Sequence, residues 1–486
     1  MREIIFVGII STLLCGCSLA PTYHRPELYI PADYKETGSW QLAAPAVAEL
    51  DRGNWWEIYN DSVLNDLEDR VTSANQNLQA AIARYEQARA IATVARSYLV
   101  PTINIIGVPD RQKTSLNVAN PATVTPFNDV LLATDLSYEI DVWGRVRNAF
   151  FSARDSARAS SADVAAIDLS LHAELASNYF SLRGTDQSQR VLDDTVKAYE
   201  KALYLNRMLY QGGAAPVEDV YLAETQLETA KTLSTDMKLR RAQLEHAIAV
   251  LIGEVPANFS LPVLKTKVEV ITIIPELPST LLERRPDIAA AELRVQAANA
   301  NIGVARAAYF PQFNLITSLG VESSSISNLF QSPSLIWSLG PALGAAALGT
   351  SVAGTPISWT LIDGGRISAL TDQAWAIYYE TVANYRQTVL NAYQEVEDNL
   401  AALHRLGQEN ITQTAAAAAA YKAVAQELDR FKGGLITYLP VVVEQSIALQ
   451  AELTSIDIRT RYQLASVQLI KALGGGWDNP NVALAD

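Results

Sequence analysis

The chain contains a helix that runs directly into a strand, and this transition occurs twice. In residues 281–312, small and apolar side chains recur at steps of three and four, as on one buried face of a helix. Pro286 suits the first turn of this helix, and Pro311 ends it. Beyond Pro311 the apolar period changes to two, which predicts a strand over residues 313–322. Residues 78–101 show the same helical pattern and the same terminal proline before a second predicted strand.

Further landmarks recur in the same order in both halves of the chain. The paired landmarks are Gly144-Arg145 with Gly365-Arg366, Tyr210-Gln-Gly-Gly with Phe431-Lys-Gly-Gly, and Ile252-Gly253 with Leu473-Gly474. Their nearly constant spacing predicts an internal duplication of about two hundred residues. We therefore expect a first repeat over residues 61–254 and a second over residues 280–475, each with a helix, a strand pair and a long helical hairpin. Residues 255–279 would link them within a small mixed domain, and residues 476–486 would form a loose tail.

Two long segments, residues 145–210 and 366–432, are almost free of glycine and proline and carry apolar residues at helical spacing. In the second segment, apolar residues at 389, 393, 396, 400 and 403 follow the seam of a coiled coil. A helix of roughly 65 residues is on the order of 100 Å long, which is more than a compact domain needs. Glycine pairs end both segments, and second helices return over residues 217–253 and 438–474. The chain is therefore predicted to form two long antiparallel hairpins, each with a tip.

The composition argues against several classes of function. A net charge of −14 gives a nucleic-acid partner no electrostatic attraction. The four histidines are widely scattered and both cysteines lie near the N-terminus, so clustered ligands for zinc or copper are not expected. The phosphate-binding loop G-x-x-x-x-G-K-[ST] does not occur, and the carboxylates are spread along helix faces, where solvation is their ordinary role. We therefore expect no enzyme, no cofactor and no metal site.

The N-terminus has the pattern of an export signal. Arg2 is followed by an apolar run over residues 4–14 that is too short to span a bilayer as a mature helix. The run ends in Leu14-Cys15-Gly16-Cys17, which resembles the processing box of bacterial lipoproteins. Residues 1–16 are then a signal peptide, and Cys17 is the first mature residue and carries lipid on its thiol. An ordinary secretory signal with incidental cysteines is the alternative.

Residues 17–60 are rich in proline, tyrosine and tryptophan, which is typical of an extended tether. Its Trp55-Trp56 pair is followed by Asp61 and Leu64, so we expect the tether to dock just before a first helix. We interpret the tryptophans as packing residues.

Four segments of the chain have one apolar and one polar face. They are residues 102–108, 130–141, 313–322 and 355–361. Two-faced segments of about ten residues suit the wall of a membrane barrel, although any one of them alone would also fit a half-buried sheet in a soluble protein. Four strands cannot enclose a pore, and open sheet edges are not viable in lipid. We therefore expect strands from several copies to complete one barrel, with the hairpins forming a helical cylinder that extends away from the membrane.

The last of these strands is the hardest to delimit. Residues 334–354 could be mistaken for a transmembrane helix, but their glycines, with Pro333 and Pro341, favour strand and loop. The boundaries of the strand therefore stay open within residues 337–362.

Several motifs are specific enough to compare with a known family. They are LLERRPDI at 281–288, AANANIGVARAAYFPQ at 297–312, YEIDVWGR at 138–145, LIDGGR at 361–366, GCSLAPTYHRP at 16–26 and ALGGGW at 472–477. These motifs resemble the TolC-like outer membrane factors, in the OprM/NodT lipoprotein branch, over essentially all of the mature chain. The resemblance implies an α+β membrane protein, a homotrimer in which four β-strands per chain complete a twelve-stranded barrel in the outer membrane, continued by a long periplasmic α-helical barrel. The linking segment would lie in its equatorial domain.

The resemblance also implies a function and partners. The chain would be the exit duct of a tripartite efflux pump in the outer membrane of a Gram-negative bacterium, exporting small molecules such as drugs. Its partners would be a periplasmic adaptor (membrane fusion) protein and an inner-membrane transporter, expected to be a proton-driven pump of the RND type. A channel for type I protein secretion shares this fold. A structural coiled-coil lipoprotein would explain the helices but not the strands.

In this family the loops that match residues 211–220 and 432–441 form the periplasmic mouth, close the resting channel and meet the adaptor. The matching residues of this chain are Tyr210, Gly212, Gly213, Pro216, Asp219 and Val220 in the first tip, and Gly433, Gly434, Ile436, Thr437, Tyr438 and Leu439 in the second. The resemblance implies that these residues contact the adaptor and form the gate.

The chain departs from the family pattern in the second tip. Where family members often carry acidic residues, this chain has Ile436 and Val443. An apolar constriction gates by excluding water rather than by charge. We therefore hypothesise a more hydrophobic closure, with nearby negative charge from Glu218, Asp219 and Glu444. The alternative is that Ile436 packs between helices.

Overall fold

The computed structural model describes residues 18–28, 34–36, 54–113, 115, 117, 125–263, 284–340 and 357–475. The chain divides into two compact units. One comprises Met1–Glu27, Arg84–Ser161 and Ala290–Arg386, and the other comprises Leu28–Ala83, Ala162–Ala289 and Gln387–Asp486. The predicted signal peptide, Cys17 and the tail over residues 476–486 lie outside the described residues, as does most of the linking segment.

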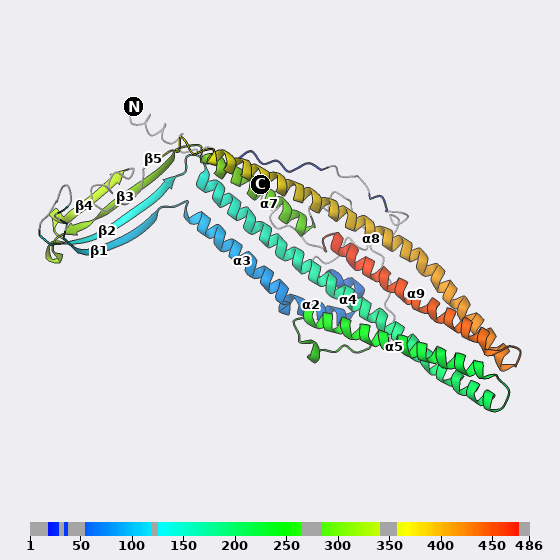
Figure 1. The fold of residues 1–486 in the computed structure, drawn as a ribbon. Coiled ribbons are helices and arrows are strands. Elements are labelled where there is room, and N and C mark those ends of the chain that lie inside the picture. Colours follow the sequence, from blue (N-terminus) through cyan, green and yellow to red (C-terminus); the bar gives the residue numbers. More distant parts are fainter. Residues whose placement is uncertain are drawn as a thin grey trace. The chain divides into compact units, whose positions relative to one another are not determined.

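The first unit contains an antiparallel sheet (Figure 1). Its described strands are β1 (Thr102–Gln112), β2 (Phe127–Ile140), β3 (Gln312–Ser323), β4 (Leu335–Gly340) and β5 (Ile357–Ser358). Their order is β1-β2-β3-β4, and β5 also pairs with β3. The first three predicted strands are confirmed with shifted ends, because backbone pairing continues where the alternating pattern has stopped, as far as Gln112 opposite Phe127.

The fourth position in the sheet is filled by two separate segments, which corrects the prediction of a single strand over residues 355–361. Gly340 of β4 lies opposite Ile316, and Ile357 of β5 lies opposite Phe313. β3 advances three residues between these two partners, whereas the chain advances seventeen from Gly340 to Ile357. β4 and β5 therefore follow one another along the same edge of β3, with an insertion between them that the period-two pattern could not reveal.

One face of the sheet is largely apolar, as the sequence pattern predicts, and the other face carries polar rows together with some apolar residues, such as Ile106 and Ile336. Across β1 to β4, one row without polar side chains is Gly107, Leu132, Val321 and Leu335, and one polar row on the other face is Asn104, Asp135, Ser318 and Ser338. The Ser318 hydroxyl donates to the Asp135 carboxylate at 2.7 Å. Within the described residues, β1 pairs only with β2 and β4 only with β3, so both edges of the sheet are open.

Three pairs of helices repeat with identical lengths. α3 (Gln76–Ser97) and α7 (Pro286–Ala307) have 22 residues each, α4 (Arg145–Gln211) and α8 (Arg366–Lys432) have 67, and α5 (Val217–Leu251) and α9 (Tyr438–Ala472) have 35. At ~1.5 Å per residue, α4 and α8 are each about 100 Å long, as predicted. None of the helices in the described ranges combines the length and the apolar character that a membrane crossing requires.

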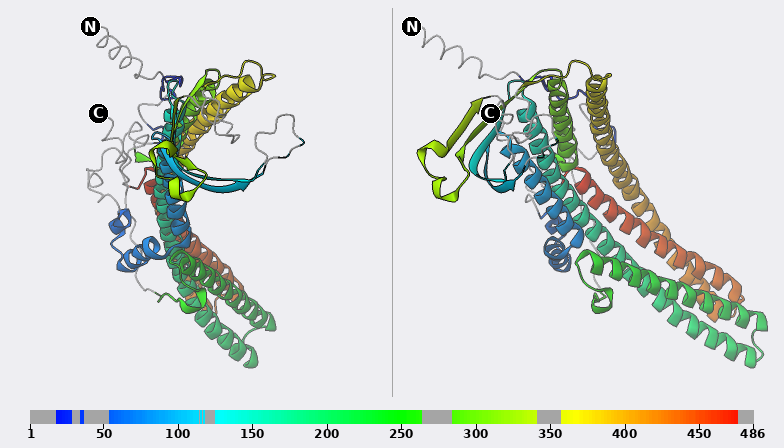
Figure 2. Two further views of the ribbon diagram at one scale, coloured as in Figure 1. Left: turned by 90° about the vertical axis from the view of Figure 1, so that its left-hand side faces the viewer. Right: turned by 60° about the vertical axis from the view of Figure 1, so that its left-hand side comes forward.

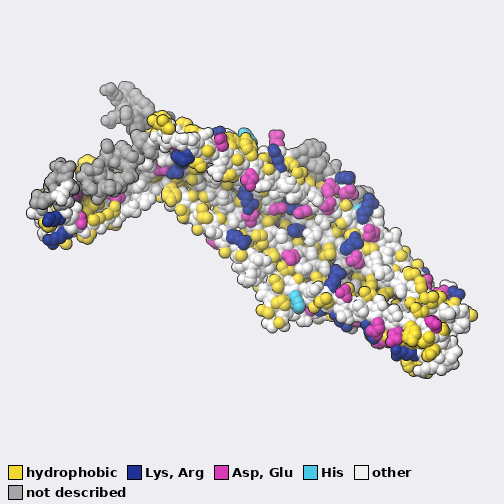
Figure 3. Space-filling view, in the orientation of Figure 1, with side chains coloured by type: hydrophobic (Ala, Val, Ile, Leu, Met, Phe, Trp, Pro, Cys, Tyr) yellow, Lys and Arg dark blue, Asp and Glu magenta, His cyan; other side chains and the backbone are white. Residues whose placement is uncertain are grey.

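The second unit contains the larger part of two hairpins that lie side by side, α4 from residue 162 onward with α5, and α8 from residue 387 onward with α9 (Figures 1 and 2). The predicted seam of α8 is largely confirmed, because Val389, Val396, Leu400 and Leu403 are buried. Tyr393 is half-buried. Charged side chains are spread over the surface of the helices, among exposed hydrophobic ones (Figure 3).

The return helices end in the same way in both repeats. The side-chain amide of Asn75 donates to the carbonyl of Leu251 at 2.7 Å, and the guanidinium of Arg285 donates to the carbonyl of Ala472 at 3.0 Å. In each repeat, the residue before a short helix thus satisfies a carbonyl that the C-terminus of the return helix leaves without an intrahelical partner. This contact gives Arg285, the second arginine of the LLERRPDI motif, a structural role.

The segment before the first repeat packs as the sequence indicates. It forms η2 (Trp55–Tyr59) just before α2 (Ser62–Ala74), the first helix of the repeat, and both Trp55 and Trp56 are buried. The Asp61 carboxylate accepts hydrogen bonds from two backbone N–H groups and so caps α2. The tryptophans are therefore core residues. The other described elements are η3 (Pro256–Asn258), η4 (Ile326–Asn328) and η5 (Ser332–Ser334).

Candidate functional site

Both hairpins turn at a pair of glycines. Gly213 in the first tip has a φ of +71°, and Gly434 in the second has a φ of +70°. In each turn the next residue donates its N–H to a carbonyl five residues earlier, at 2.8 Å in the first tip and 3.0 Å in the second. This is a helix-ending turn in which a left-handed glycine avoids the strain that a Cβ would cause. The predicted tips are therefore built alike.

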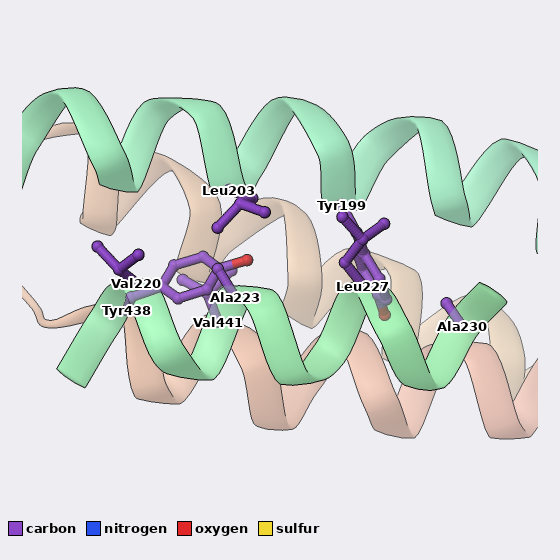
Figure 4. Close-up of a cluster of buried hydrophobic side chains, with 8 residues drawn as sticks. All are labelled: Tyr199, Leu203, Val220, Ala223, Leu227, Ala230, Tyr438 and Val441. Atoms are coloured by element: carbon purple, nitrogen blue, oxygen red, sulfur yellow. The ribbon is translucent and has the colours of Figure 1, made fainter. Parts of the chain in front are cut away.

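A cluster of buried residues joins the two hairpins behind their turns (Figure 4). Its members are Tyr199 and Leu203 of α4, Val220, Ala223, Leu227 and Ala230 of α5, and Tyr438 and Val441 of α9. Tyr438, with 1% of its surface exposed, reaches from the second hairpin into the first. Its phenol donates to Oε1 of Gln226 at 3.2 Å, and Nε2 of Gln226 donates to Oε1 of Gln445 at 3.1 Å. We call this contact of α5 with α9 the intra-chain joint.

Asp219 contributes a charged contact to the intra-chain joint. This residue of α5 is 5% exposed, and its carboxylate accepts a hydrogen bond from the backbone N–H of Tyr438, the first residue of α9. Thr437, which precedes α9, makes no side-chain cap. A carboxylate of the first hairpin therefore caps the positive N-terminus of a helix in the second. Burial raises the pKa of Asp219, and the N–H bond offsets part of that rise.

The predicted tip residues fall into two groups. The exposed ones are Tyr210, Gly212, Gly213, Pro216, Gly433, Gly434, Thr437 and Leu439. Asp219, Val220 and Tyr438 are buried, so Asp219 serves as a structural cap more than as surface charge. Ile436 is half-buried and packs against the cluster. The exposed group is available to a partner, and the buried group holds the hairpins together.

Sequence reasoning missed Tyr199, Gln226 and Gln445. The apolar members of the cluster could have been found from their helical spacing, since those on α5 follow one another at steps of three and four. The glutamine pair gave no such signal, because its members lie 219 positions apart in the chain. Contacts at that separation depend on the fold of the whole unit.

A second group of titratable side chains lies away from the tips. Nδ1 of His172 on α4 lies 2.6 Å from the Glu68 carboxylate on α2, and Nε2 lies 3.4 Å from Asp168. The imidazole also stacks on Trp56, with ring centroids 4.4 Å apart. Burial opposes the charging of His172, but the two carboxylates outweigh it and raise its pKa to about 9. This group fastens α2 and η2 to α4. Among the described residues, no three His, Cys, Asp or Glu side chains are placed to hold a metal ion.

The chain can be compared with known proteins along nearly its whole length. The model of a family described as "Outer membrane efflux protein" matches residues 67–254 and 277–475. Outer membrane protein OprJ of Pseudomonas aeruginosa is 32% identical over 97% of this chain and 95% of that protein. Toluene efflux pump outer membrane protein TtgF of Pseudomonas putida is 30% identical over 97% of this chain and 96% of that protein.

Solved structures resemble the fold closely. The outer-membrane channel OprN aligns with a TM-score of 0.85 at 26% identity, covering 95% of this chain and 100% of that chain. The open state of the MtrE outer membrane channel of Neisseria gonorrhoeae aligns with a TM-score of 0.81 at 27% identity, covering 95% of this chain and 98% of that chain.

Proposed function

Because the chain belongs to the outer membrane efflux protein family, we propose that it is the outer-membrane exit duct of a tripartite efflux pump. The observation that carries the proposal is the presence, in one chain, of a two-faced sheet with open edges and two helices of 67 residues. Three copies, each supplying four positions of the sheet, complete a twelve-stranded barrel that leaves no edge in the lipid. The hairpins of the three copies continue this barrel as a helical tube in the periplasm.

The duct works with a periplasmic adaptor protein and an inner-membrane transporter. The transporter supplies the energy, and we assign it to the proton-driven RND type. The cargo is a small organic molecule. Relatives of this chain are named for toluene efflux, antibiotic efflux and pyoverdine export, which favours this cargo over the polypeptides of type I secretion.

The exposed part of each tip is where the adaptor would dock. Tyr210 and Leu439 offer apolar surface next to the glycine turns, and about half of each side chain is exposed. The turns themselves carry no side chain at either glycine, so a partner helix can approach their backbone closely. We assign the gate to the second tip, with Ile436 as an apolar element that excludes water from the closed mouth.

We also assign the lipid anchor to Cys17, on the strength of the Leu14-Cys15-Gly16-Cys17 sequence. Intact-mass measurement of the membrane-extracted protein tests this assignment. The expected mass is that of a chain beginning at Cys17 with added acyl groups, and the Cys17→Ala variant should retain its signal peptide. A mature chain that begins at another residue, without lipid, would contradict the assignment.

Two measurements test the proposed function. Purified protein reconstituted in a planar bilayer should carry ionic current, whereas a structural lipoprotein would carry none. A strain that lacks the gene should become more susceptible to small toxic compounds, and the gene should restore resistance. Unchanged susceptibility together with the loss of a secreted polypeptide would favour the type I secretion channel instead.

A further inference from the structure

A hollow of about 180 Å³ lies in the second unit, between residues 181–192 of α4, 233–240 of α5 and 453–460 of α9. Leu192 and Ile456 form part of its floor and are each 1% exposed. Leu233, which is 38% exposed, lies where the hollow opens to solvent. Voids larger than a water molecule are few in packed proteins, and an apolar cavity of about 150 Å³ holds a benzene ring. The hollow therefore has room for a guest with one ring.

The lining of the hollow is polar at one end and apolar at the other. α4 and α9 run antiparallel here, because Nε2 of Gln468 donates to the Ser177 hydroxyl at 3.1 Å, and a Cβ added at Gly184 would collide with Thr460. Hydroxyl side chains line the end beside this close contact, and apolar side chains line the end nearer to the hairpin tips. The hydroxyl group is Ser181, Thr185, Ser188 and Thr460, and the apolar group is Leu192, Leu233, Met237 and Leu453.

Two of the hydroxyls are free to bind a guest. Those of Thr185 and Thr460 donate to carbonyls of their own helices, Ser181 and Ile456, at 2.9 Å each. Those of Ser181 and Ser188 make no hydrogen bond to any residue that the structure describes. Water can satisfy these hydroxyls, but it gains nothing beside the leucines. A guest with a polar head and an apolar body suits both ends.

The mouth of the hollow carries charges of both signs. Arg240 of α5 and Asp457 of α9 line it and are both exposed. Asp457 also lies 3.5 Å from Arg461 in an exposed ion pair. Because a cation and an anion border the same opening, their effects on a charged head largely cancel. The polar head that the hollow favours is therefore neutral, such as a hydroxyl group.

The two repeats provide an internal map from one hairpin to the other. The ends of α4 and α8 correspond, as do those of α5 and α9, and every one of these four correspondences has the same offset of 221 residues, from Arg145 with Arg366 to Leu251 with Ala472. The left-handed glycines Gly213 and Gly434 obey the same offset. Each position in the first hairpin therefore has an identified counterpart in the second.

The map shows that the lining of the hollow is particular to α4. Larger or more polar side chains stand at the counterparts of three of its residues, namely Arg405 for Gly184, Glu409 for Ser188 and Gln413 for Leu192. The second hairpin thus replaces the residues that leave space or offer apolar surface in the first. Its counterpart positions can serve as controls outside the hollow.

We propose that the hollow binds a small neutral amphiphile with one aromatic ring and one hydroxyl group, of the class of benzyl alcohol. The ring packs against the leucines, and its hydroxyl bonds with Ser181 and Ser188. The bound molecule braces α4, α5 and α9, since a ligand that binds the folded state stabilises it. The site needs only the fold of the second unit, so it does not rest on the proposed function.

Protection of an introduced cysteine tests the proposal on the purified full-length protein. Ser188→Cys places a thiol in the hollow, and the matched Glu409→Cys places one at the exposed counterpart, in a chain whose own cysteines are Cys15 and Cys17. Mass spectrometry of the peptide around each position follows its alkylation. Benzyl alcohol at about ten times its half-maximal concentration should slow alkylation at position 188 about tenfold, because about one site in ten is then open. The rate at position 409 should not change.

The size of the alcohol separates binding in the hollow from a general effect on the detergent. Anthracenemethanol is more apolar than benzyl alcohol, so an effect through the detergent would be stronger with it, whereas the hollow should exclude its three rings. We expect no protection by this compound. Equal slowing at both cysteines, stronger slowing by the three-ring alcohol, or no slowing by benzyl alcohol would each overturn the proposal.

Two further changes in the Ser188→Cys chain test the two ends separately. Ser181→Ala removes a hydroxyl but keeps the space, so it should weaken protection by benzyl alcohol and leave protection by toluene as it was. Leu453→Phe fills the apolar end and should abolish protection by both. Equal losses for the two compounds with Ser181→Ala, or full protection with Leu453→Phe, would contradict the assignment. Bilayer current and drug susceptibility decide the proposed function separately, because this readout is binding alone.

Discussion

The first hairpin, α4 with α5, and the second, α8 with α9, have helices of the same lengths and turns of the same geometry, but different side chains fill them. The first is closed by Tyr199, Leu203 and the inserted Tyr438. At the counterpart positions the second has Ala420 and Val424. Helix length and turn geometry set the dimensions of a tube, whereas the packing residues set how firmly each hairpin is held. A duplicated chain can therefore build a regular tube from hairpins of unequal stability.

Removal of the Tyr438 side chain should produce the largest difference in stability between the two hairpins. Tyr438→Ala leaves a cavity in the cluster and should destabilise the intra-chain joint by ~3–5 kcal/mol, the usual cost for a buried aromatic residue. The counterpart change Val217→Ala should cost about 1 kcal/mol, because a smaller side chain is truncated. Hydrogen exchange of the backbone amides at the start of α9 measures the first effect as local opening, and exchange at the start of α5 measures the second. Equal exchange in the two variants would mean that the two hairpins are equally packed.

The two repeats also differ in the aromatic side chain that holds the N-terminal segment. The contact made by His172 in the first repeat should depend on pH. His172 has Tyr393 as its counterpart, which packs against Tyr34 with ring centroids 6.4 Å apart. Because the pKa of His172 is raised to about 9, its contribution is fully present below the ordinary value near 6.5 and is lost as the pH rises through about 9. We expect this loss to reach ~3 kcal/mol at most.

Thermal unfolding of the wild-type protein and of His172→Gln, between neutral and alkaline pH, measures this dependence. The wild type should lose stability over that range, and the variant should lose less. Tyr393→Phe is the matched control and should leave the pH dependence as in the wild type. A variant that keeps the full dependence would show that other groups carry it.

Charge introduced at Ile436 tests whether the second tip closes by excluding water. Ile436→Asp should hydrate the constriction and raise the single-channel conductance in planar bilayers. Ile436→Leu keeps the side chain apolar and should conduct as the wild type does. If the aspartate variant shows unchanged current, Ile436 acts only in packing against the cluster.

Loss of the Asp219 cap should have a smaller effect, and this effect should be confined to α9. Asp219→Ala should destabilise the first turn of α9 by about 1 kcal/mol, as loss of a helix cap usually does, and Asp219→Asn should retain most of the capping. Pro440→Ala, at the counterpart position, removes no cap and should leave α5 unaffected. Hydrogen exchange in the first turns of α5 and α9 reports both. Faster exchange in α5 of the Pro440 variant would argue against the mapping between the hairpins.

The smallest difference is expected at the turns. Gly213→Ala and Gly434→Ala each place a Cβ on a residue with a φ near +70°, in space that is otherwise open. Each should cost ~1 kcal/mol of local stability, and the two costs should agree, because the strain is in the backbone itself. Proteolysis rates at the two tips compare them directly. Unequal rates would show that the turns differ in a way their geometry does not reveal.

Periodicity alone predicted much of this molecule. The lengths of α4 and α8, the start of α7 at Pro286, the glycine turns and the two faces of the sheet all follow from patterns within a few residues. The intra-chain joint could not be predicted in this way. Its glutamines are 219 residues apart, and Asp219 caps a helix of the other hairpin. The split fourth position of the sheet was missed for a similar reason, because an insertion separates two segments that pair with the same strand.

The central claim is that one copy leaves its sheet incomplete and that three copies complete it. The mass of the protein–detergent complex, after subtraction of the bound detergent and lipid, tests this claim most directly. We expect a single species that contains three chains and that persists on dilution. A stable species containing one chain, with its strands still folded, would contradict the account.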